Sequence, residues 1–343
     1  MRNRAPCVSV IIPVYNAETC LPACIEALKA QTQENFEAIF VDDGSADGSL
    51  AILRAAELED NRFRVFAQEH QNAGAARNRG LKEANGKYLS FLDVDDDYEP
   101  SLLQMASSLL ESTSAEIAVY HFRELAADGA VSCRAGFPDG LAAADGNLFF
   151  PQAEPEKALF FGGASVWNKM YRAELIRRDN LRFDEISAYN DLTFVLRANL
   201  AAERIVCLDA CLYTYRYNRP GSVSVKKGSE YALIREALDS LTLQERERDP
   251  DIIPIANAHF LIKTLLMDIG DYHTAQAARF DHWCRQYLRE THFDRKRIAA
   301  FYPQLNSMIF AFRVLDIHMI RIMDRLGIIS LLRRYIHGRR ERK

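Results

Sequence analysis

The sequence predicts an α/β protein with a Rossmann-like, mostly parallel sheet flanked by helices, followed by a helical region at its C-terminal end. Two observations predict this class. Short apolar segments alternate with stretches of helical periodicity as far as about residue 216, and from about residue 225 only the helical periodicity continues. We therefore expect an α/β domain over residues 1–224 and a helical region over residues 225–343.

Four short apolar segments in the first hundred residues predict strands, at residues 8–12, 36–41, 63–66 and 88–92. The first is almost continuously apolar, which suits a central parallel strand covered on both faces. Helices are expected between these strands, because leucines recur at helical spacing after Leu21 and after Leu50. A further helix is expected over residues 74–84, since a glycine opens it and Asn85-Gly86 closes it.

Beyond residue 100 the same alternation continues less regularly. Pro100 predicts the start of a helix. We expect later strands at residues 117–122, 204–208 and 212–216, and helices at residues 154–161, around residue 175 and from residue 190. Residues 126–146 are small, polar and rich in glycine, so we expect a loop or a lid there.

Polar turns follow three of the expected strands, with the sequences PVYN at residues 13–16, DDGS at residues 42–45 and DVDD at residues 93–96. In an open parallel sheet, ligands bind beyond the carboxyl ends of the strands. The sequence therefore predicts a ligand site at one edge of the sheet.

The third of these turns is strongly acidic, because Asp93, Asp95, Asp96 and Asp97 lie within five residues. Two carboxylates about 5 Å apart repel by roughly 3 kcal/mol at an effective dielectric constant of ~20. A hard divalent cation such as Mg²⁺ or Mn²⁺ would offset this repulsion, since it prefers carboxylate oxygens. On this stretch alone, a solvated acidic turn is an equally good interpretation.

Composition and charge narrow the class of protein. The chain is 48% hydrophobic and 26% charged, as in a soluble globular protein, and its net charge of −4 argues against a nucleic-acid binder. The seven cysteines are an odd number and lie mostly in apolar runs, which favours reduced thiols in the cytoplasm. The apolar run near the N-terminus stops at Pro13, so it indicates a strand and not a signal peptide.

The C-terminal end combines an apolar stripe with positive charge. Apolar residues recur every three or four positions from Met308 to Ile329, as on a long amphipathic helix. Residues 319–343 contain eight Lys or Arg and two acidic residues, a local net charge of +6. Two interpretations remain open: the stripe packs on the catalytic domain or on a second chain, or the helix lies on an anionic membrane surface.

Seven segments, taken together and in order, resemble the inverting nucleotide-sugar glycosyltransferases of family 2, which have the GT-A fold. They are VSVIIPVYN (8–16), FEAIFVDDGSADGS (36–49), AARNRG (75–80), GKYLSFLDVDDD (86–97), VWNKMYRAEL (166–175), RFDEISAYND (182–191) and YRYNRPGSVS (215–224). The resemblance covers residues 7–224. It implies a hexosyl transfer in the synthesis of bacterial surface polysaccharides, with a nucleotide sugar, most often a UDP-sugar, as the donor.

The resemblance also implies a donor site. It assigns the nucleotide to Pro13, Tyr15 and Asn16, the base to Asp43, and the diphosphate region to Arg77. Asp93-Val94-Asp95 is similar to the DXD element of the family, whose aspartates hold the donor diphosphate through Mn²⁺ or Mg²⁺. Asp96 matches a neighbour of the donor sugar.

On the acceptor side, the resemblance assigns a stacking aromatic ring to Trp167 and an acceptor contact to Lys169. Asp191 matches the catalytic base of the family. Inverting transfer is an in-line displacement, so one carboxylate suffices to take the proton of the attacking hydroxyl group. The implied acceptor is a growing saccharide, expected on a polyprenyl diphosphate at the cytoplasmic face of the membrane; the oligomeric state stays open.

Three departures from the family pattern are visible. Asn190 stands where the residue before the base is usually glutamate, Asp97 stands where an aromatic residue is common, and residues 71–78 are about two residues shorter than in many relatives. The loss of the acid at position 190 keeps an alternative open, a nucleotide-sugar-binding or scaffold subunit with impaired catalysis. A nucleotidyl-transferring enzyme is disfavoured, because the turn after the first strand lacks glycine.

Overall fold

The structure is a computed structural model, and it describes residues 6–125, 129–134, 136–137, 148–158, 161, 163–216, 231–245, 252–263, 275–291 and 296. The chain divides into two compact units, Met1–Arg219 and Pro220–Lys343. Our predicted boundary after residue 224 stays a prediction, since residues 217–230 lie outside the described part.

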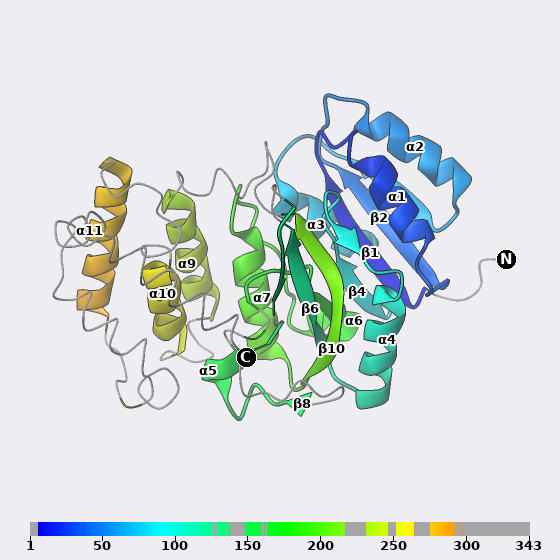
Figure 1. The fold of residues 1–343 in the computed structure, drawn as a ribbon. Helices are drawn as coiled ribbons and strands as arrows, with labels where there is room; N and C mark the ends of the chain where they lie inside the picture. Colours follow the sequence, from blue (N-terminus) through cyan, green and yellow to red (C-terminus); the bar gives the residue numbers. More distant parts are fainter. Residues whose placement is uncertain are drawn as a thin grey trace. The chain divides into compact units, whose positions relative to one another are not determined.

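The first unit is built on one mixed sheet (Figure 1). In spatial order its strands are β3 (Phe63–Ala67), β2 (Phe36–Asp42), β1 (Val8–Val14), β4 (Tyr88–Phe91), β9 (Lys169–Arg172), β6 (Ile117–Leu125), β10 (Ile205–Arg216) and β5 (Asp97–Tyr98). The strands β3, β2, β1 and β4 run parallel to one another, as predicted, and β10 runs parallel to β6. The α/β class and its flanking helices are therefore confirmed.

Antiparallel pairing enters where the sequence pattern is weak. Strand β9 lies antiparallel between β4 and β6, and β5 is antiparallel to β10. Two short strands, β7 (Val131–Arg134) and β8 (Leu148–Phe149), pair with β6 and β10. Strand β7 lies within the segment that we expected to be a loop; the remainder of residues 126–146, apart from 129–130 and 136–137, lies outside the described residues.

Pro13 lies inside β1, although the sequence pattern suggested that it would end the strand. Its partner in β2 is Val41, whereas β4 has already stopped at Phe91, opposite Ile11. Pro13 therefore has a paired strand on one side only. A proline, which has no N–H to donate, is tolerated at such a position.

Helices cover both faces of the sheet. The helices are α1 (Leu21–Lys29), α2 (Ser49–Glu59), α3 (Ala73–Glu83), α4 (Leu102–Thr113), α5 (Pro155–Ala158), α6 (Ala173–Arg178) and α7 (Asn190–Ala201). Alternate residues of β1, among them Val10 and Ile12, share a buried cluster with apolar residues of α1 and α4. On the other face α3 packs so closely that a Cβ on Gly80 would lie 2.4 Å from Ile11 Cγ2.

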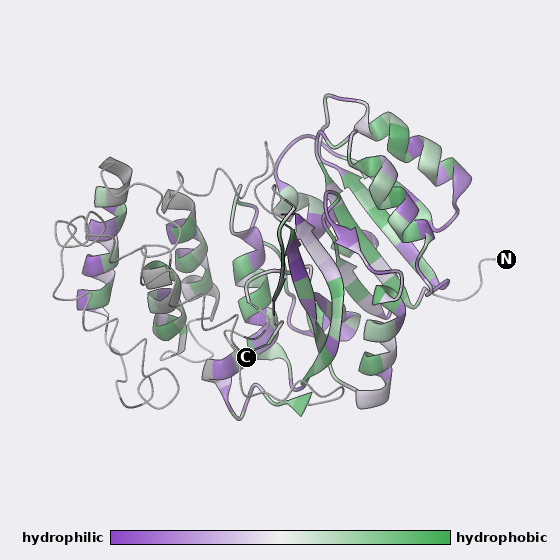
Figure 2. Ribbon diagram, viewed as in Figure 1, coloured by the Kyte–Doolittle hydropathy of each residue, from purple (hydrophilic) through white to green (hydrophobic). Residues whose placement is uncertain are grey.

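In Figure 2 the strands β1 and β2 are mainly hydrophobic, whereas the helices α1 and α2 also carry hydrophilic residues.

An aromatic cluster contains Phe91 of β4, Phe194 of α7 and Phe183, which precedes α7, with ring centroids 4.0 to 5.4 Å apart. This packing fixes α7 against the centre of the sheet.

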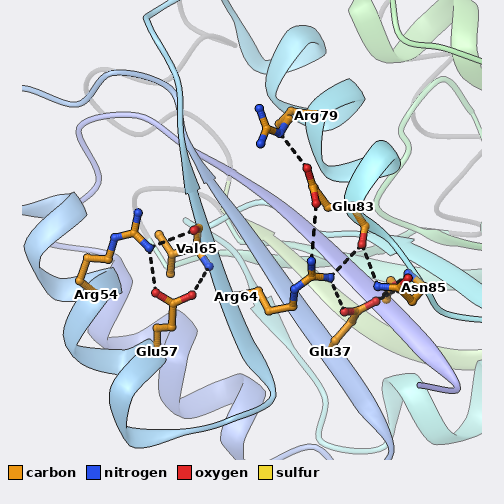
Figure 3. Close-up of polar contacts among 9 residues, drawn as sticks. Glu37, Arg54, Glu57, Arg64, Val65, Arg79, Glu83 and Asn85 are labelled. Carbon is orange, nitrogen blue, oxygen red and sulfur yellow. Dashed lines mark hydrogen bonds and ion pairs between the residues drawn. The ribbon is translucent and has the colours of Figure 1, made fainter. Parts of the chain in front are cut away.

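A buried carboxylate joins the amino-terminal ends of the central strands. Glu37 of β2 accepts hydrogen bonds from Ser9 Oγ (2.7 Å), the Asn85 backbone N–H (2.8 Å) and Arg64 Nη1 (2.8 Å), as Figure 3 shows in part. Burial alone would raise the pKa of Glu37, but these donors hold the pKa below its ordinary value. The cluster is structural, because it lies at the opposite end of the strands from the predicted ligand site.

The outer edge of β3 is protected by side chains of α2. Glu57 accepts a hydrogen bond from the Val65 N–H at 2.9 Å, and Arg54 donates one to the Val65 carbonyl at 3.0 Å (Figure 3). Both free backbone groups of this edge residue are thus satisfied within the protein.

The second unit contains α9 (Tyr231–Glu245), α10 (Ile252–Lys263) and α11 (Ala275–Glu290) among its described residues. The expected change from strands to helices is confirmed for these residues. The amphipathic stripe from residue 308 and the basic segment 319–343 lie outside the described residues, so their interpretation stays open. Within the described part of the chain, no helix is both long enough and apolar enough to cross a membrane.

Candidate active site

The carboxyl ends of β1, β2 and β4 lie at one edge of the sheet. The register pairs Val14 with Asp42, and Ile11 with Phe91. The three polar turns after these strands therefore gather at this edge, which is the arrangement that the turn pattern predicts.

Asn16 connects the first of these turns to the second. It has a left-handed φ of 48°, its N–H donates to Ser45 Oγ (2.9 Å), and its Oδ1 accepts from the Ala46 N–H (2.8 Å). Asparagine tolerates this conformation better than most residues. The Asn16 side chain thus holds the turns after β1 and β2 together.

Asp43 organises the loop that follows β3. It is 2% exposed and accepts hydrogen bonds from Gln68 Nε2 (2.7 Å) and the Gln71 N–H (3.1 Å), while His70 Nδ1 lies 3.0 Å from Oδ2. The His70 ring stacks on Tyr15 with centroids 4.1 Å apart and an interplanar angle of 20°. Tyr15 is 49% exposed, so a flat aromatic surface stands beside a buried carboxylate.

Arg77 joins the acidic turn to the start of α7. Its Nη2 donates to Asp93 Oδ1 at 2.7 Å, and its Nη1 donates to Asn190 Oδ1 at 2.9 Å. The side chain is buried beside the Phe183 ring, and its Nε has no hydrogen-bond partner among the described residues. One guanidinium therefore brings together two segments that are distant in sequence.

Asp96 is buried against β10 and does not line an open surface. Tyr213 Oη donates to its Oδ2 at 2.7 Å and the Arg216 N–H donates to its Oδ1 at 2.9 Å. Burial, and then the neighbouring Asp93 and Asp95, raise the pKa of Asp96 well above its ordinary value. The sugar contact that the resemblance implied for Asp96 stays a prediction.

The acidic turn has the chemistry of a site for a hard divalent cation. Asp93 and Asp95 are both partly exposed, and they lie within five residues of chain that also contain the carboxylates of Asp96 and Asp97. Within the described residues no cluster of three or more His, Cys, Asp or Glu side chains is arranged around a metal position. Two carboxylates fit a Mg²⁺-like ion whose remaining ligands are substrate phosphates and water.

Helix α7 places Asp191 in its first turn, partly exposed, directly after Asn190. The segment that leads into α7 passes very close to α3. A Cβ added to Gly74 of α3 would lie 2.2 Å from the Asp184 carbonyl oxygen and 3.2 Å from Asn190 Cβ. Since Arg77 ties Asn190 to Asp93, Asp191 belongs to the same edge of the sheet as the acidic turn.

Trp167 and Lys169 are buried in the structure. The Trp167 ring is 6% exposed and stacks on Tyr213, with centroids 4.5 Å apart and an interplanar angle of 9°. Lys169 is 0% exposed, and its Nζ donates to the carbonyl oxygens of Ser165 and Gly163. Direct contacts of these residues with a saccharide therefore stay predictions.

Three residues that shape this edge had no role assigned from the sequence: His70, Tyr213 and Arg216, the last of which lies in the segment 215–224. His70 belongs to no motif, and the two β10 residues donate hydrogen bonds to Asp96, which lies 117 and 120 positions earlier in the sequence. Only the pairing of β5 with β10 brings them there.

The architecture and its acidic edge define the class, a GT-A glycosyltransferase. Residues 9–132 match the family model for glycosyl transferase family 2. EpsH of Bacillus subtilis, which is named as a glycosyltransferase, is 32% identical over 287 residues, 80% of each chain. EpsJ of the same organism is 35% identical over 225 residues, covering 64% of this chain and 63% of the relative. The chain belongs to glycosyl transferase family 2.

The solved structures show the same fold. TarS 1–349 of S. aureus in complex with UDP-GlcNAc has a TM-score of 0.73 and 21% identity, over 93% of this chain and 92% of that one. The same protein in complex with UDP has a TM-score of 0.69. At 21% identity the comparison shows the fold alone.

Proposed function

We propose that this glycosyltransferase transfers a hexosyl unit, with inversion, from a UDP-sugar to a growing saccharide in cell-surface polysaccharide synthesis. The observation that carries the proposal is the Arg77 bridge between Asp93 and Asn190. It supports a single site in which the diphosphate-binding turn faces the residue proposed as the base.

The donor nucleotide fits the region around Tyr15 and Asp43. A half-exposed aromatic ring offers a stacking surface for a base, and a nearby buried carboxylate offers an acceptor for a ring N–H. Uracil has such an N–H. The complexes of TarS with UDP and UDP-GlcNAc support the choice of a uridine nucleotide for this fold.

In the proposed reaction Asp191 is the general base. Its carboxylate takes the proton of an acceptor hydroxyl group while that oxygen forms a bond to the anomeric carbon. The bond between the anomeric carbon and the β-phosphate oxygen breaks on the opposite face, and UDP leaves with the electron pair. Attack and departure on opposite faces invert the anomeric configuration.

Asp93 and Asp95 would hold a divalent cation, Mn²⁺ or Mg²⁺, which supplies positive charge to the leaving diphosphate when it is bound. Arg77 contributes a second positive charge at the same turn. Asp93 neutralises part of that charge, so Arg77 acts mainly by fixing the carboxylate in place.

The proposed acceptor is lipid-linked, and the proposed place of action is the cytoplasmic face of the membrane. The support is the sequence of residues 319–343, with its net charge of +6, beside an apolar stripe of helical spacing. Both features lie outside the described residues.

The test compares Asp191→Asn with the wild type in two assays. A thermal-shift panel of nucleotide sugars, with and without Mn²⁺, measures donor binding, since a ligand at 100 times its dissociation constant stabilises by ~2.7 kcal/mol. A transfer assay with labelled UDP-sugars and a pool of lipid-linked acceptors measures turnover. We expect Asp191→Asn to bind the donor normally and to lose about 10² to 10⁴ in the rate of transfer.

The matched control is Glu203→Gln, an exposed acid just beyond the other end of α7. It should leave both assays unchanged. A wild-type chain that binds a UDP-sugar but forms no product, even in a single turnover, would support the scaffold alternative that Asn190 keeps open. Full activity in Asp191→Asn would refute its role as the base.

A further inference from the structure

Lys169 occupies an unusual position for a charged residue. It is the first residue of β9, it pairs with Val119 of β6, and its side chain is 0% exposed. Because β9 runs antiparallel to β4, its first residue lies beside the carboxyl end of β4, from which the acidic turn departs. A buried ammonium thus stands next to the proposed active site.

The ammonium of Lys169 holds the segment that precedes it. Its Nζ donates to the carbonyl oxygens of Ser165 (2.7 Å) and Gly163 (3.3 Å), and to Asn168 Oδ1 (2.8 Å). All three acceptors belong to residues 163–168, the segment that carries Trp167. Hydrogen bonds from a charged donor are about twice as strong as neutral ones.

A second, uncharged side chain fixes the same segment. Tyr120 of β6 donates from its Oη to the Trp167 carbonyl oxygen at 2.6 Å. Residues 163–168 are therefore held both by a phenol and by an ammonium. The two anchors can be removed separately, which allows the role of the charge to be tested.

Burial and a nearby carboxylate act on the charge of Lys169 in opposite directions. Burial lowers the pKa of Lys169 to about 7, while the Asp191 carboxylate of α7 acts in the opposite direction. Tyr171 of β9 and Tyr120 of β6 are also titratable, but burial raises the pKa of both phenols, so they remain neutral. Asp191 is thus a negative charge that favours the charged form of Lys169.

We propose that Lys169 is a positioning residue for transfer, whose ammonium holds residues 163–168 in the arrangement that receives the acceptor. The inference rests on the proposed function, in which Asp191 is the base. In place of a direct acceptor contact, Lys169 has an indirect role: it touches neither substrate and acts through the segment that carries Trp167.

The experiment measures kcat and the acceptor KM of the full chain between pH 6 and pH 9, with a UDP-sugar and a lipid-linked acceptor. In the wild type, transfer should decline as the pH rises past about 7, because Lys169 then loses its proton. Lys169→Met should retain UDP binding but lose about 10²-fold in kcat over acceptor KM, the size of effect expected for misplaced reacting groups. Its remaining activity should show no decline in this pH range.

Two variants separate charge from anchoring. Tyr120→Phe removes the neutral anchor, so it should raise the acceptor KM and leave the alkaline decline where it was. Asn168→Ala removes one acceptor of the ammonium and should shift the decline to lower pH, since the charged form is less stabilised. If Lys169→Met fails to fold, as shown by thermal unfolding and UDP binding, the Asn168→Ala profile decides the question.

The inference is overturned by wild-type transfer in Lys169→Met, by an alkaline decline that persists in that variant, or by an Asn168→Ala profile identical to that of the wild type. A wild-type chain that transfers no sugar overturns the proposed function instead. The two failures are therefore distinguishable.

Discussion

Asp93 and Asn190 accept hydrogen bonds from one guanidinium, that of Arg77, at 2.7 and 2.9 Å. Asp93 belongs to the acidic turn after β4, and Asn190 begins the helix that carries the proposed base. The hydrogen bond to Asp93 is charge-assisted, whereas the hydrogen bond to Asn190 is made to a neutral amide oxygen. Asn190, which departs from the family pattern, is thus still a structural partner of Arg77.

The first prediction concerns the geometry of this bridge. Arg77→Lys keeps the charge but offers a compact ammonium in place of a planar fork, so it cannot reproduce both contacts. We expect transfer to fall by about 10²-fold, as is typical when reacting groups are misplaced. The control is Arg79→Lys, in the same helix, where the side chain is 43% exposed and pairs with Glu83. Wild-type rates in Arg77→Lys would show that a positive charge alone suffices there.

The second prediction concerns the neutral residue beside Arg77. Asn190→Asp adds a carboxylate at the start of α7, beside Arg77 and so close to the turn that is proposed to bind a diphosphate. We expect the dissociation constant of UDP to increase, and to increase most at low salt, where such repulsion is least screened. Asn35→Asp, an exposed change at the opposite end of β2, is the control. Isothermal titration at two salt concentrations measures the effect, and an unchanged UDP affinity would contradict it.

The third prediction concerns the aromatic surface at Tyr15. Removing the ring in Tyr15→Ala should weaken UDP binding by about 1–3 kcal/mol, the usual contribution of stacking between a base and an aromatic ring. Tyr15→Phe keeps the ring, so it should bind UDP like the wild type. Equal affinity of the alanine and phenylalanine variants would place the base elsewhere.

Strands β1, β2 and β4 were predictable because each is a buried, mainly apolar segment followed by a polar turn. Strand β9 was not, because the four residues Lys169–Arg172 show neither a continuous apolar run nor a clear alternation. The antiparallel position of this strand follows from its fit between β4 and β6, which is a tertiary effect.

The environment of individual site residues was even less predictable. Asp95 and Asp96 are adjacent in sequence, yet the first is partly exposed and the second is buried beneath Tyr213. Likewise the resemblance implied an acceptor contact for Lys169 but could not indicate that its side chain is buried, with hydrogen-bond partners close by in sequence. Motif spacing identifies which residues lie at an edge, but the direction of each side chain depends on distant strands.

The fourth prediction concerns stability and the buried Glu37. Glu37→Gln removes the shorter of the two ion pairs that Arg64 makes, leaves its 3.6 Å ion pair with Glu83, and puts an amide where the cluster needs an acceptor, so we expect a loss of about 1–3 kcal/mol in the free energy of unfolding. Because folding lowers the pKa of Glu37 from its ordinary 4.5, its stabilising effect is present above that pH and is lost as the pH falls through the folded pKa.

Urea unfolding at pH 7 and at pH 4 measures this difference. The gap between the wild type and Glu37→Gln should be largest at pH 7 and should narrow at pH 4. Glu59→Gln, whose side chain is 67% exposed and pairs with Lys29, should change stability little at either pH. A gap that widens in acid would contradict the assignment of the charge to Glu37.

The fifth prediction concerns the basic C-terminal segment. Deletion after Ile317 removes much of the apolar stripe and all eight Lys and Arg of residues 319–343. If the segment binds membranes, the wild type should sediment with anionic vesicles and the truncated chain should stay in the supernatant, since each cation near such a surface contributes about 1 kcal/mol. A full-length variant with Arg333, Arg334, Arg339 and Arg340 changed to Gln separates the effect of the positive charge from the effect of deleting the segment. It should lose binding to anionic vesicles while keeping its UDP affinity. Undiminished sedimentation of the truncated chain would instead favour packing of the stripe on the protein itself or on a second copy.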